Sequence, residues 1–308
     1  TVMNYFENKE ENKTASRLVL GTAQLGMPYG IANSTGQPDF DTAVAIIKTA
    51  WECGIREFDT AQAYGESEAV LGKALSSLGI ANDARIITKL DPKLDPRQGQ
   101  DIKKAVHRSL ERLQLSRLFG LMLHREEWLD DLDRGLESAL QALVLDGSVQ
   151  HLGVSLYTPA MALRALKSDI VDMIQVPANI LDRRFADAGV VTLANEKRKQ
   201  VYIRSVFLQG LLLMKPEDLP VNMGFAKATL SEIDNLCAQY KYSRQQLALL
   251  YIKCKYPQAR TIVGAETLTQ VEQNINIWIN NHISTSEIKA SDSWSVVDER
   301  IINPSLWS

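Results

Sequence analysis

Eight short apolar runs recur along the chain, and they constrain its fold more than any other feature of the sequence. These runs lie at residues 17–22, 55–60, 85–90, 118–124, 149–155, 171–176, 200–205 and 260–265. Between them, longer stretches such as 41–53 and 132–145 repeat apolar residues at the spacing of one helix face. Strands that alternate with helices predict an α/β fold with a parallel sheet. Most of the runs are apolar throughout, so we expect the sheet to be buried on both faces.

A closed (β/α)8 TIM barrel accounts for this pattern best, since the runs follow one another at intervals of roughly thirty residues. The rival is an open, doubly wound sheet. That fold places a GxGxxG turn after its first strand, where this chain has LGTAQLG at 20–26. We therefore predict a single barrel over residues 17–308, which includes a C-terminal tail at 281–308, and a mobile lead-in at 1–16.

Local signals indicate where individual helices begin and end. Asp41 and Ser67 are expected N-caps, since their side-chain oxygens can accept hydrogen bonds from free backbone N–H groups. Gly79 and Gly147 are expected to close helices, because a left-handed residue is favoured there. The interval at 206–259 is long enough for two helices or an extended loop.

Composition argues against several other classes of protein. The 308 residues carry a formal net charge of −3, so nothing global attracts nucleic acid or an anionic membrane. Cys53, Cys237 and Cys254 form no CxxC pair and the four histidines lack zinc-ligand spacing, so we expect reduced thiols and no metal. The first residues lack the apolar segment of a secretory signal. These features predict a cytoplasmic protein.

Ionisable side chains stand at or just after the ends of three successive predicted strands. Asp59 and Tyr64 follow the second run, Lys89 ends the third and His124 ends the fourth. Neighbouring strands lie about 4.8 Å apart, so these groups can converge at one rim of the barrel. A buried charge without a partner is costly. We therefore expect Asp59 to pair with Lys89, with the ammonium group beside the Tyr64 hydroxyl.

This arrangement would suit proton transfer to a carbonyl oxygen. A free tyrosine has a pKa near 10, and a neighbouring cation favours the phenolate. We therefore expect the pKa of Tyr64 to be lowered, which would make it a proton donor and acceptor. His124 is expected to donate a hydrogen bond to the carbonyl oxygen and to orient the substrate.

The residues around these positions resemble those of a known family. FDTAQAYGESEAVLG at 58–72 resembles the signature of the aldo-keto reductases, and TKL at 88–90 and LMLHR at 121–125 are similar to that family's Lys and His segments. The resemblance implies a TIM barrel that binds NADPH or NADH without a Rossmann domain and reduces aldehydes or ketones. It also implies a small-molecule carbonyl substrate and a monomer or small homo-oligomer.

The same resemblance implies which residues hold the cofactor. From the nicotinamide end to the adenosine end they are Gly21, Thr22, Ser155, Gln175, Arg204, Ser205, Gln209, Gly210, Gly264, Gln270, Gln273 and Asn274, with Asn179 nearby. The chain departs from the family at 155–156, where Ser-Leu replaces Ser-Asn. Arg204 stands where relatives usually have an aromatic ring under the nicotinamide, and a guanidinium plane can also stack on a ring.

Glu266, in the adenosine segment, is a departure with a consequence for cofactor choice. A carboxylate there should repel the 2′-phosphate of NADPH unless Lys253, Lys255 or Arg260 offsets its charge. We therefore expect NADH to compete seriously with NADPH.

Two other functions stay open. One is a nicotinamide-binding sensor or regulatory protein on the same fold. The other is an aldolase that uses Lys89 as a Schiff base, although such a lysine has to be unpaired and desolvated. The long loop at 26–38 contains small and polar residues, which favours a roomy entrance for a sugar or another polyhydroxy carbonyl.

Overall fold

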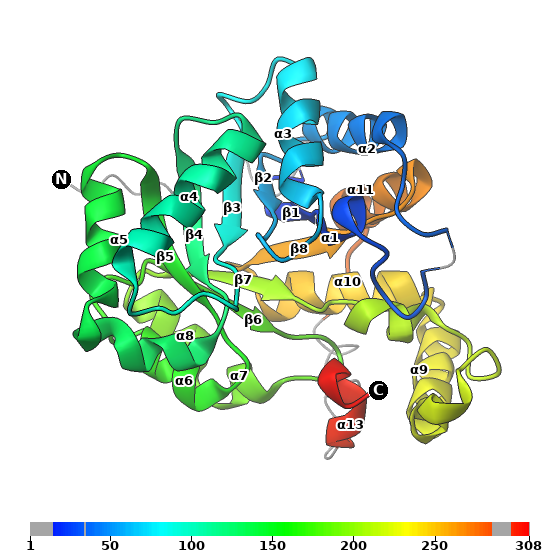
Figure 1. Ribbon diagram of the computed structural model, residues 1–308. Coiled ribbons are helices and arrows are strands. Elements are labelled where there is room, and N and C mark those ends of the chain that lie inside the picture. The colour runs from blue at the N-terminus through cyan, green and yellow to red at the C-terminus, as the bar shows by residue number, and fades with distance from the viewer. Residues whose placement is uncertain (1–14, 34, 285–296, 308) are drawn as a thin grey trace.

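Eight parallel strands close into a barrel in the order β1 to β8, surrounded by helices (Figure 1). The computed structural model describes residues 15–33, 35–284 and 297–307. The strands are β1 Leu18–Gly21, β2 Glu57–Asp59, β3 Arg85–Lys89, β4 Leu118–Leu123, β5 Val149–Ser155, β6 Met173–Pro177, β7 Gln200–Arg204 and β8 Arg260–Gly264. Each strand overlaps the run predicted for it, and the predicted (β/α)8 barrel is confirmed. Residues 1–14 of the expected lead-in and 285–296 and 308 of the expected tail lie outside the described residues.

The connections between strands are mostly helical. The α-helices are α1 Ala23–Gly26, α2 Phe40–Glu52, α3 Ser67–Ser77, α4 Gly99–Leu113, α5 Leu136–Leu145, α6 Pro159–Ala165, α7 Arg184–Asp187, α8 Val190–Glu196, α9 Lys227–Tyr240, α10 Arg244–Lys255, α11 Leu268–Asn280 and α13 Glu299–Ile302. Shorter 3₁₀ segments are η2 Glu126–Arg134, η3 Leu208–Leu213, η4 Val221–Ala226 and η5 Pro304–Leu306. Of the two possibilities left open for the interval between β7 and β8, the structure has two helices, α9 and α10. Helix α4 illustrates the apolar spacing of one helix face, because its residues Ile102, Val106 and Leu113 are buried on the same side.

Some local expectations about the helix ends are wrong. Helix α2 is capped by Asp39, whose carboxylate accepts from the backbone N–H of Thr42, and Asp41 lies inside the first turn. Ser67 is the first residue of α3 rather than its cap, and its hydroxyl bonds elsewhere. The helix expected over 132–145 is interrupted at Gly135, so α5 begins at Leu136. Gly79 and Gly147 have φ of 69° and 82°, as expected for residues that close helices.

The inside of the barrel is packed with side chains. Val19, Ile87, Met122, Met173 and Tyr202 form one buried cluster there, separate from the larger core between strands and helices. Glycines make room for the largest of them, since a Cβ at Gly120 would lie 2.7 Å from Met173 Cε. The barrel is therefore a filled core, and ligands can enter only at its rim.

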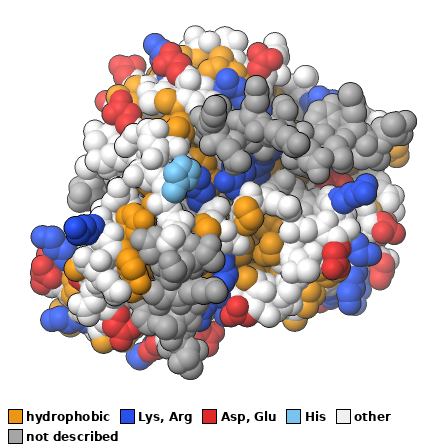
Figure 2. Space-filling model, turned by 180° about the vertical axis from the view of Figure 1, so that it is seen from behind, with side chains coloured by type: hydrophobic (Ala, Val, Ile, Leu, Met, Phe, Trp, Pro, Cys, Tyr) orange, Lys and Arg blue, Asp and Glu red, His pale blue; other side chains and the backbone are white. Residues whose placement is uncertain are grey.

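Charged side chains of both signs are interspersed on the molecular surface. Figure 2 shows Lys and Arg lying among Asp and Glu around the edges of one face, with hydrophobic side chains between them. Among the described residues, no helix combines the length and the hydropathy needed to cross a membrane.

The close approach of α1 to α3 depends on Gly26. A Cβ at this position would lie 2.6 Å from Ser67 Cβ, and it would also overlap the backbone of Tyr64. We expect Gly26→Ala to lower the free energy of unfolding by about 1–3 kcal/mol, the usual cost of overpacking. Gly224→Ala is the matched control, because no other atoms surround that position within 4 Å. Denaturant unfolding of both variants measures the difference. Equal stabilities would show that the α1–α3 contact tolerates a side chain.

Candidate active site

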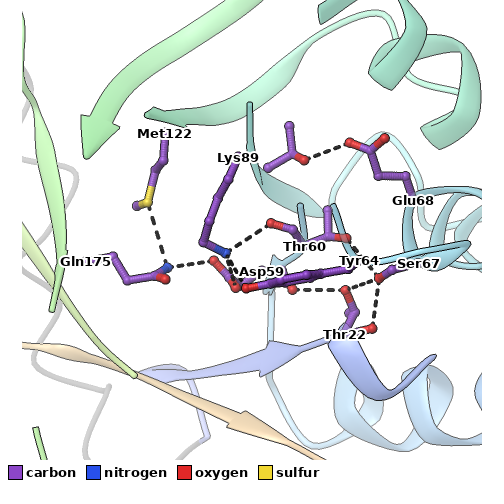
Figure 3. A network of polar contacts seen from close by, with 10 residues as sticks. Thr22, Asp59, Thr60, Tyr64, Ser67, Glu68, Lys89, Met122 and Gln175 are labelled. Atoms are coloured by element: carbon purple, nitrogen blue, oxygen red, sulfur yellow. Dashed lines mark hydrogen bonds and ion pairs between the residues drawn. The ribbon is translucent and has the colours of Figure 1, made fainter. Parts of the chain in front are cut away.

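Asp59, Lys89 and Tyr64 meet at the carboxyl-terminal rim of the barrel. Lys89 Nζ donates to Asp59 Oδ2 at 2.6 Å and to the Thr60 carbonyl oxygen at 3.1 Å. It lies 3.4 Å from the Tyr64 hydroxyl oxygen, and Figure 3 shows the three side chains converging. The Lys89 and Asp59 side chains are only 1% and 5% exposed. The expected ion pair is therefore present, and it is shielded from water.

A side chain from across the barrel completes the surroundings of Asp59. Gln175, in the middle of β6, donates from Nε2 to Asp59 Oδ1 at 2.7 Å and lies 3.7 Å from Met122 Sδ. Both carboxylate oxygens of Asp59 thus have a donor. The resemblance pointed to Gln175 only as a ligand of the nicotinamide, so its contact with Asp59 was not anticipated. The contact fixes the carboxylate that holds Lys89.

The expectation that Lys89 lowers the pKa of Tyr64 is wrong for this structure. Burial raises the pKa of the Tyr64 hydroxyl above its ordinary value, and the charge of Asp59 raises it further. Arg204 acts in the opposite direction but does not outweigh them. The physical reason is that Asp59 neutralises the ammonium of Lys89 at 2.6 Å, so Tyr64 meets an ion pair rather than a free cation. Tyr64 is therefore held in its protonated form.

His124 lies beside Tyr64 as a neutral ring. The two ring centroids are 6.1 Å apart in an edge-to-face arrangement. Burial, and then the charges of Lys89 and Arg204, lower the pKa of His124 to about 4. At neutral pH its imidazole is uncharged and can donate only one hydrogen bond. Such a ring can orient a carbonyl oxygen without transferring a proton to it.

Buried hydroxyl groups tie β1 to the start of α3. Ser67 Oγ lies 2.7 Å from Thr22 Oγ1 and 2.9 Å from Thr60 Oγ1, and it donates to the Thr22 carbonyl oxygen at 2.8 Å (Figure 3). The Thr22 hydroxyl also donates to the Asp59 carbonyl oxygen. This network positions the segment that carries Tyr64. It also occupies the Thr22 hydroxyl, which is not exposed at all.

A cavity of about 360 Å³ opens at the same rim. Asp59 and Tyr64 line it, as do most of the expected cofactor residues: Gly21, Thr22, Gln175, Arg204, Ser205, Gln209, Gly210, Gly264, Gln270, Gln273 and Asn274. Ser155 is 1% exposed and does not line this cavity, and neither do Lys89 and His124. Positions that are far apart in the sequence are thus brought to one site.

The loop between α1 and α2, which its sequence led us to expect at the entrance, forms a wall of the cavity. Tyr29, Gly30 and Asn33 line the cavity. The backbone N–H of Ile31 donates to the Gln209 carbonyl oxygen at 2.9 Å, which joins this loop to the segment after β7. The length and the small, polar residues of the loop were the signals in the sequence, and neither predicts its contact with the segment after β7.

The segment after β7 is held in an uncommon backbone conformation. Ser205, Leu208 and Gln209 have φ of 62°, 51° and 55°, which non-glycine residues seldom adopt. Asn179 stabilises this segment, because its Nδ2 donates to the Ser205 carbonyl oxygen at 3.2 Å while its Oδ1 accepts from the backbone N–H of Leu181. Asn179 is fully buried and does not line the cavity, so its contacts indicate a supporting role.

Comparison with known proteins shows the family to which the chain belongs. The model described as "Aldo/keto reductase family" matches residues 17–295. The chain belongs to this family. Its similarity extends to the uncharacterized oxidoreductase YqkF of Bacillus subtilis, 26% identical over 91% of this chain and 96% of the relative. It is also 27% identical to the L-galactose dehydrogenase of Arabidopsis thaliana, over 84% and 83% of the two chains.

A solved structure agrees with the barrel. The holo form of the aldo-keto reductase AKR11C1 from Bacillus halodurans superposes with a TM-score of 0.74 at 23% identity, over 93% of this chain and 95% of that chain. The family match confirms the resemblance noted in the sequence, and together with the oxidoreductase relatives it confirms the assignment of the protein as an oxidoreductase.

Aldo/keto reductases generally use NAD(P)H, and the cavity of this reductase suits a dinucleotide. Gly21 and Gly264 are paired in register at neighbouring strand ends and line the cavity. The amide side chain of Gln24 also lines it and packs against Gly264, where a Cβ would overlap Gln24 Oε1. The amide side chains of Gln270, Gln273 and Asn274 line the cavity near the first turns of α11. The buried Nε of Arg204 has no hydrogen-bond partner within the described part of the chain. These donors and acceptors fit a polar, extended cofactor. No group of His, Cys, Asp and Glu in the described residues could hold a metal ion.

Glu266 lies where its charge can act on such a cofactor. It lines the cavity, accepts from Thr35 Oγ1 at 3.3 Å, and has a pKa raised by burial. The three basic residues that might have offset it do not line the cavity. Lys253 Nζ donates to the Asn281 carbonyl oxygen, and Arg260 lies against Glu57 at the other end of the barrel. Thus none of the three offsets Glu266 at the cavity.

Proposed function

We propose that this aldo/keto reductase reduces an aldehyde or a ketone to an alcohol with NADPH or NADH, and that Tyr64 donates the proton. The observation that carries the proposal is the Tyr64 hydroxyl at the cavity wall, 3.4 Å from Lys89 Nζ. The bound nicotinamide supplies the hydride. The cofactor positions of the proposal are the expected residues that line the cavity, which excludes Ser155. Arg204 also lines the cavity, but its guanidinium reaches toward Leu156 on the β5 side of the rim.

Tyr64 is suited to the acid role because its raised pKa keeps the phenol protonated at neutral pH. As negative charge develops on the carbonyl oxygen, the alkoxide becomes far more basic than the phenolate, so the proton moves to the substrate. Lys89 donates toward the phenol oxygen and stabilises the phenolate that is left. Neutral His124 orients the carbonyl oxygen with its single N–H.

The ion pair disfavours the aldolase alternative. A Schiff-base lysine has to be neutral and unpaired, whereas Lys89 donates to Asp59 at 2.6 Å. The sensor alternative differs from the proposal only in turnover. Purified protein should oxidise NADH or NADPH when aldehydes and ketones are added, followed by the loss of the reduced nicotinamide absorbance. Tight cofactor binding with no turnover across a broad panel of carbonyls would favour the sensor.

The cofactor preference should respond to Glu266. At an effective dielectric near 20, a carboxylate about 5 Å from one phosphate charge costs on the order of 3 kcal/mol. Solvent and salt reduce this to about 1 kcal/mol, or roughly fivefold in affinity. We therefore expect Glu266→Arg to tighten NADPH selectively, with a gain that shrinks as salt rises. Fluorescence titrations with NADPH and with NADH give the two dissociation constants.

Glu272→Arg is the matched control for this change, because Glu272 is exposed on α11, does not line the cavity, and alters the net charge equally. It should leave the ratio of the two affinities unchanged. If the unmodified protein already binds NADPH a hundredfold more tightly than NADH, Glu266 does not govern the choice.

A further inference from the structure

Arg204 is a cation in the cavity whose charge no carboxylate balances. It ends β7 and lines the cavity with Tyr29 and Tyr64. Within the described residues it forms no ion pair, only hydrogen bonds to a hydroxyl and a carbonyl oxygen. The two acidic residues that line the cavity are engaged elsewhere, Asp59 with Lys89 and Glu266 with Thr35. Among the described residues, Arg204 is therefore a cation of the cavity without an ion-pair partner, and the neutral hydroxyl of Thr35 likewise leaves Glu266 as a carboxylate without one.

Three N–H groups of this guanidinium have no hydrogen-bond partner among the described residues. Arg204 Nη2 donates to the Leu156 carbonyl oxygen at 3.2 Å and Nη1 to Ser205 Oγ at 3.3 Å. A guanidinium has five N–H groups, so these two bonds leave one N–H on each terminal nitrogen and the one on Nε. The Nε atom is buried and has no hydrogen-bond partner in the described chain. A buried donor left unpaired is unfavourable. Because this Nε is shielded, the N–H groups from which a ligand would accept are those of the two terminal nitrogens.

The guanidinium is directed toward the β5 side of the rim. It reaches from the end of β7 across β6 to Leu156, and it stacks 4.5 Å over the Tyr157 ring, both of which follow β5. The glycine and amide positions that suit the adenosine end of a cofactor lie on the opposite side, at β8 and α11. One face of the guanidinium is thus occupied by Tyr157, and its charge is held away from the adenosine end.

The charge of Arg204 acts on Tyr64 and His124, the residues proposed to donate the proton and to orient the carbonyl. It acts to lower the pKa of Tyr64, of Tyr29 and of His124, which places the guanidinium within electrostatic reach of all three. A substrate whose carbonyl lies at Tyr64 and His124 therefore brings its neighbouring groups close to this cation. Arginine binds carboxylates through parallel N–H bonds, which adds geometric selection to the attraction of charge.

We infer that Arg204 binds a carboxylate carried by the substrate, so that the preferred substrates of this reductase are oxo acids rather than uncharged carbonyl compounds. The inference rests on the proposed function and names the substrate class for the same site. The carboxylate supplies the missing counter-charge, satisfies the free N–H groups, and fixes the carbonyl relative to Tyr64.

Matched pairs of substrates test this inference. Aldehydes that end in a carboxylate, such as 4-oxobutanoate and its longer homologues, are compared with the methyl-terminated aldehydes of equal length. For at least one chain length, kcat/KM should favour the acid by about 10- to 100-fold, the range expected for hydrogen bonds to a charged group. The preference should shrink as ionic strength rises. Arg204→Gln should bring the ratio of kcat/KM between acid and uncharged aldehyde close to one. Arg204→Lys should keep only part of the preference for the acid, since lysine keeps the charge but lacks the planar guanidinium.

A binding measurement separates this inference from the proposed function and from a cofactor role of Arg204. Calorimetric titration of the cofactor-bound protein with 4-hydroxybutanoate should show binding, and Arg204→Gln should weaken this binding by about the same 10- to 100-fold. The measurement does not require the protein to catalyse the reaction. Fluorescence titration gives the NADH and NADPH affinities of the same variant. If Arg204→Gln loses affinity for the cofactor, and kcat/KM falls by the same factor for the acid and for the methyl-terminated aldehyde, then Arg204 serves the cofactor and the inference is overturned. A reductase that turns over uncharged aldehydes as well as the acids would overturn the inference and leave the proposed function intact.

Discussion

Tyr64→Phe is expected to lower kcat for carbonyl reduction by about 10²–10⁴, the range that general acid catalysis usually supplies. The substitution removes one hydroxyl, which lies 3.4 Å from Lys89 Nζ, and keeps the ring that packs edge-to-face with His124. The affinity for NADH and NADPH should change little. Steady-state rates and fluorescence titrations on the same preparation give both quantities. Tyr240→Phe, at the end of α9, loses an equivalent hydroxyl outside the cavity and should keep normal turnover.

The pH dependence gives a second view of the same residue. Reduction needs the protonated phenol, which is present below the pKa of Tyr64, and burial raises that pKa. Reduction should therefore persist as pH rises through the neutral and mildly alkaline range. The reverse oxidation needs the phenolate and should increase with pH over that range. If Tyr64→Phe turned over nearly normally, or if reduction failed with a midpoint near neutral pH, another group would have to be the proton donor.

Lys89→Met should abolish most turnover and also destabilise the fold. The variant removes the cation that stabilises the phenolate of Tyr64, so the pH at which the tyrosine ionises should rise further. It also leaves Asp59, with its side chain 5% exposed, as a buried carboxylate without its partner. Removing one member of a buried pair costs about 3–5 kcal/mol. Denaturant unfolding is therefore measured alongside the rate.

Asp59→Asn distinguishes positioning from chemistry. The carboxylate holds Lys89 and raises the pKa of Tyr64, so its removal should move the pH profile downward and reduce kcat less than Lys89→Met does. The double variant, Asp59→Asn with Lys89→Met, should regain part of the lost stability, because no buried charge is left unpaired, but not the activity. If Asp59→Asn changes neither the rate nor the pH profile, the ion pair has no role in catalysis.

The sequence by itself determined the barrel and the residues at its rim. Strand and helix periodicity are local properties, so the positions of β1 to β8 could be predicted from their apolar runs. In a parallel barrel all strand ends meet at one rim, and that alone brings Asp59, Lys89 and His124 together once the strands are assigned. The need to pair a buried charge then predicted the contact between Asp59 and Lys89, which the structure has at 2.6 Å.

The tertiary structure decided what depends on distance and direction. The sign of the pKa change at Tyr64 follows from its burial and from how closely Asp59 neutralises Lys89, and neither can be read from spacing. Likewise, the sequence could not show that Arg204 reaches toward Leu156 or that the loop after α1 packs on Gln209. Loop and side-chain directions are set by contacts between residues far apart in the chain, whereas periodicity reports only on neighbours. Electrostatic interactions weaken with distance and with exposure to water. The protonation states of the site residues therefore depend on distances and burial that only the tertiary structure provides.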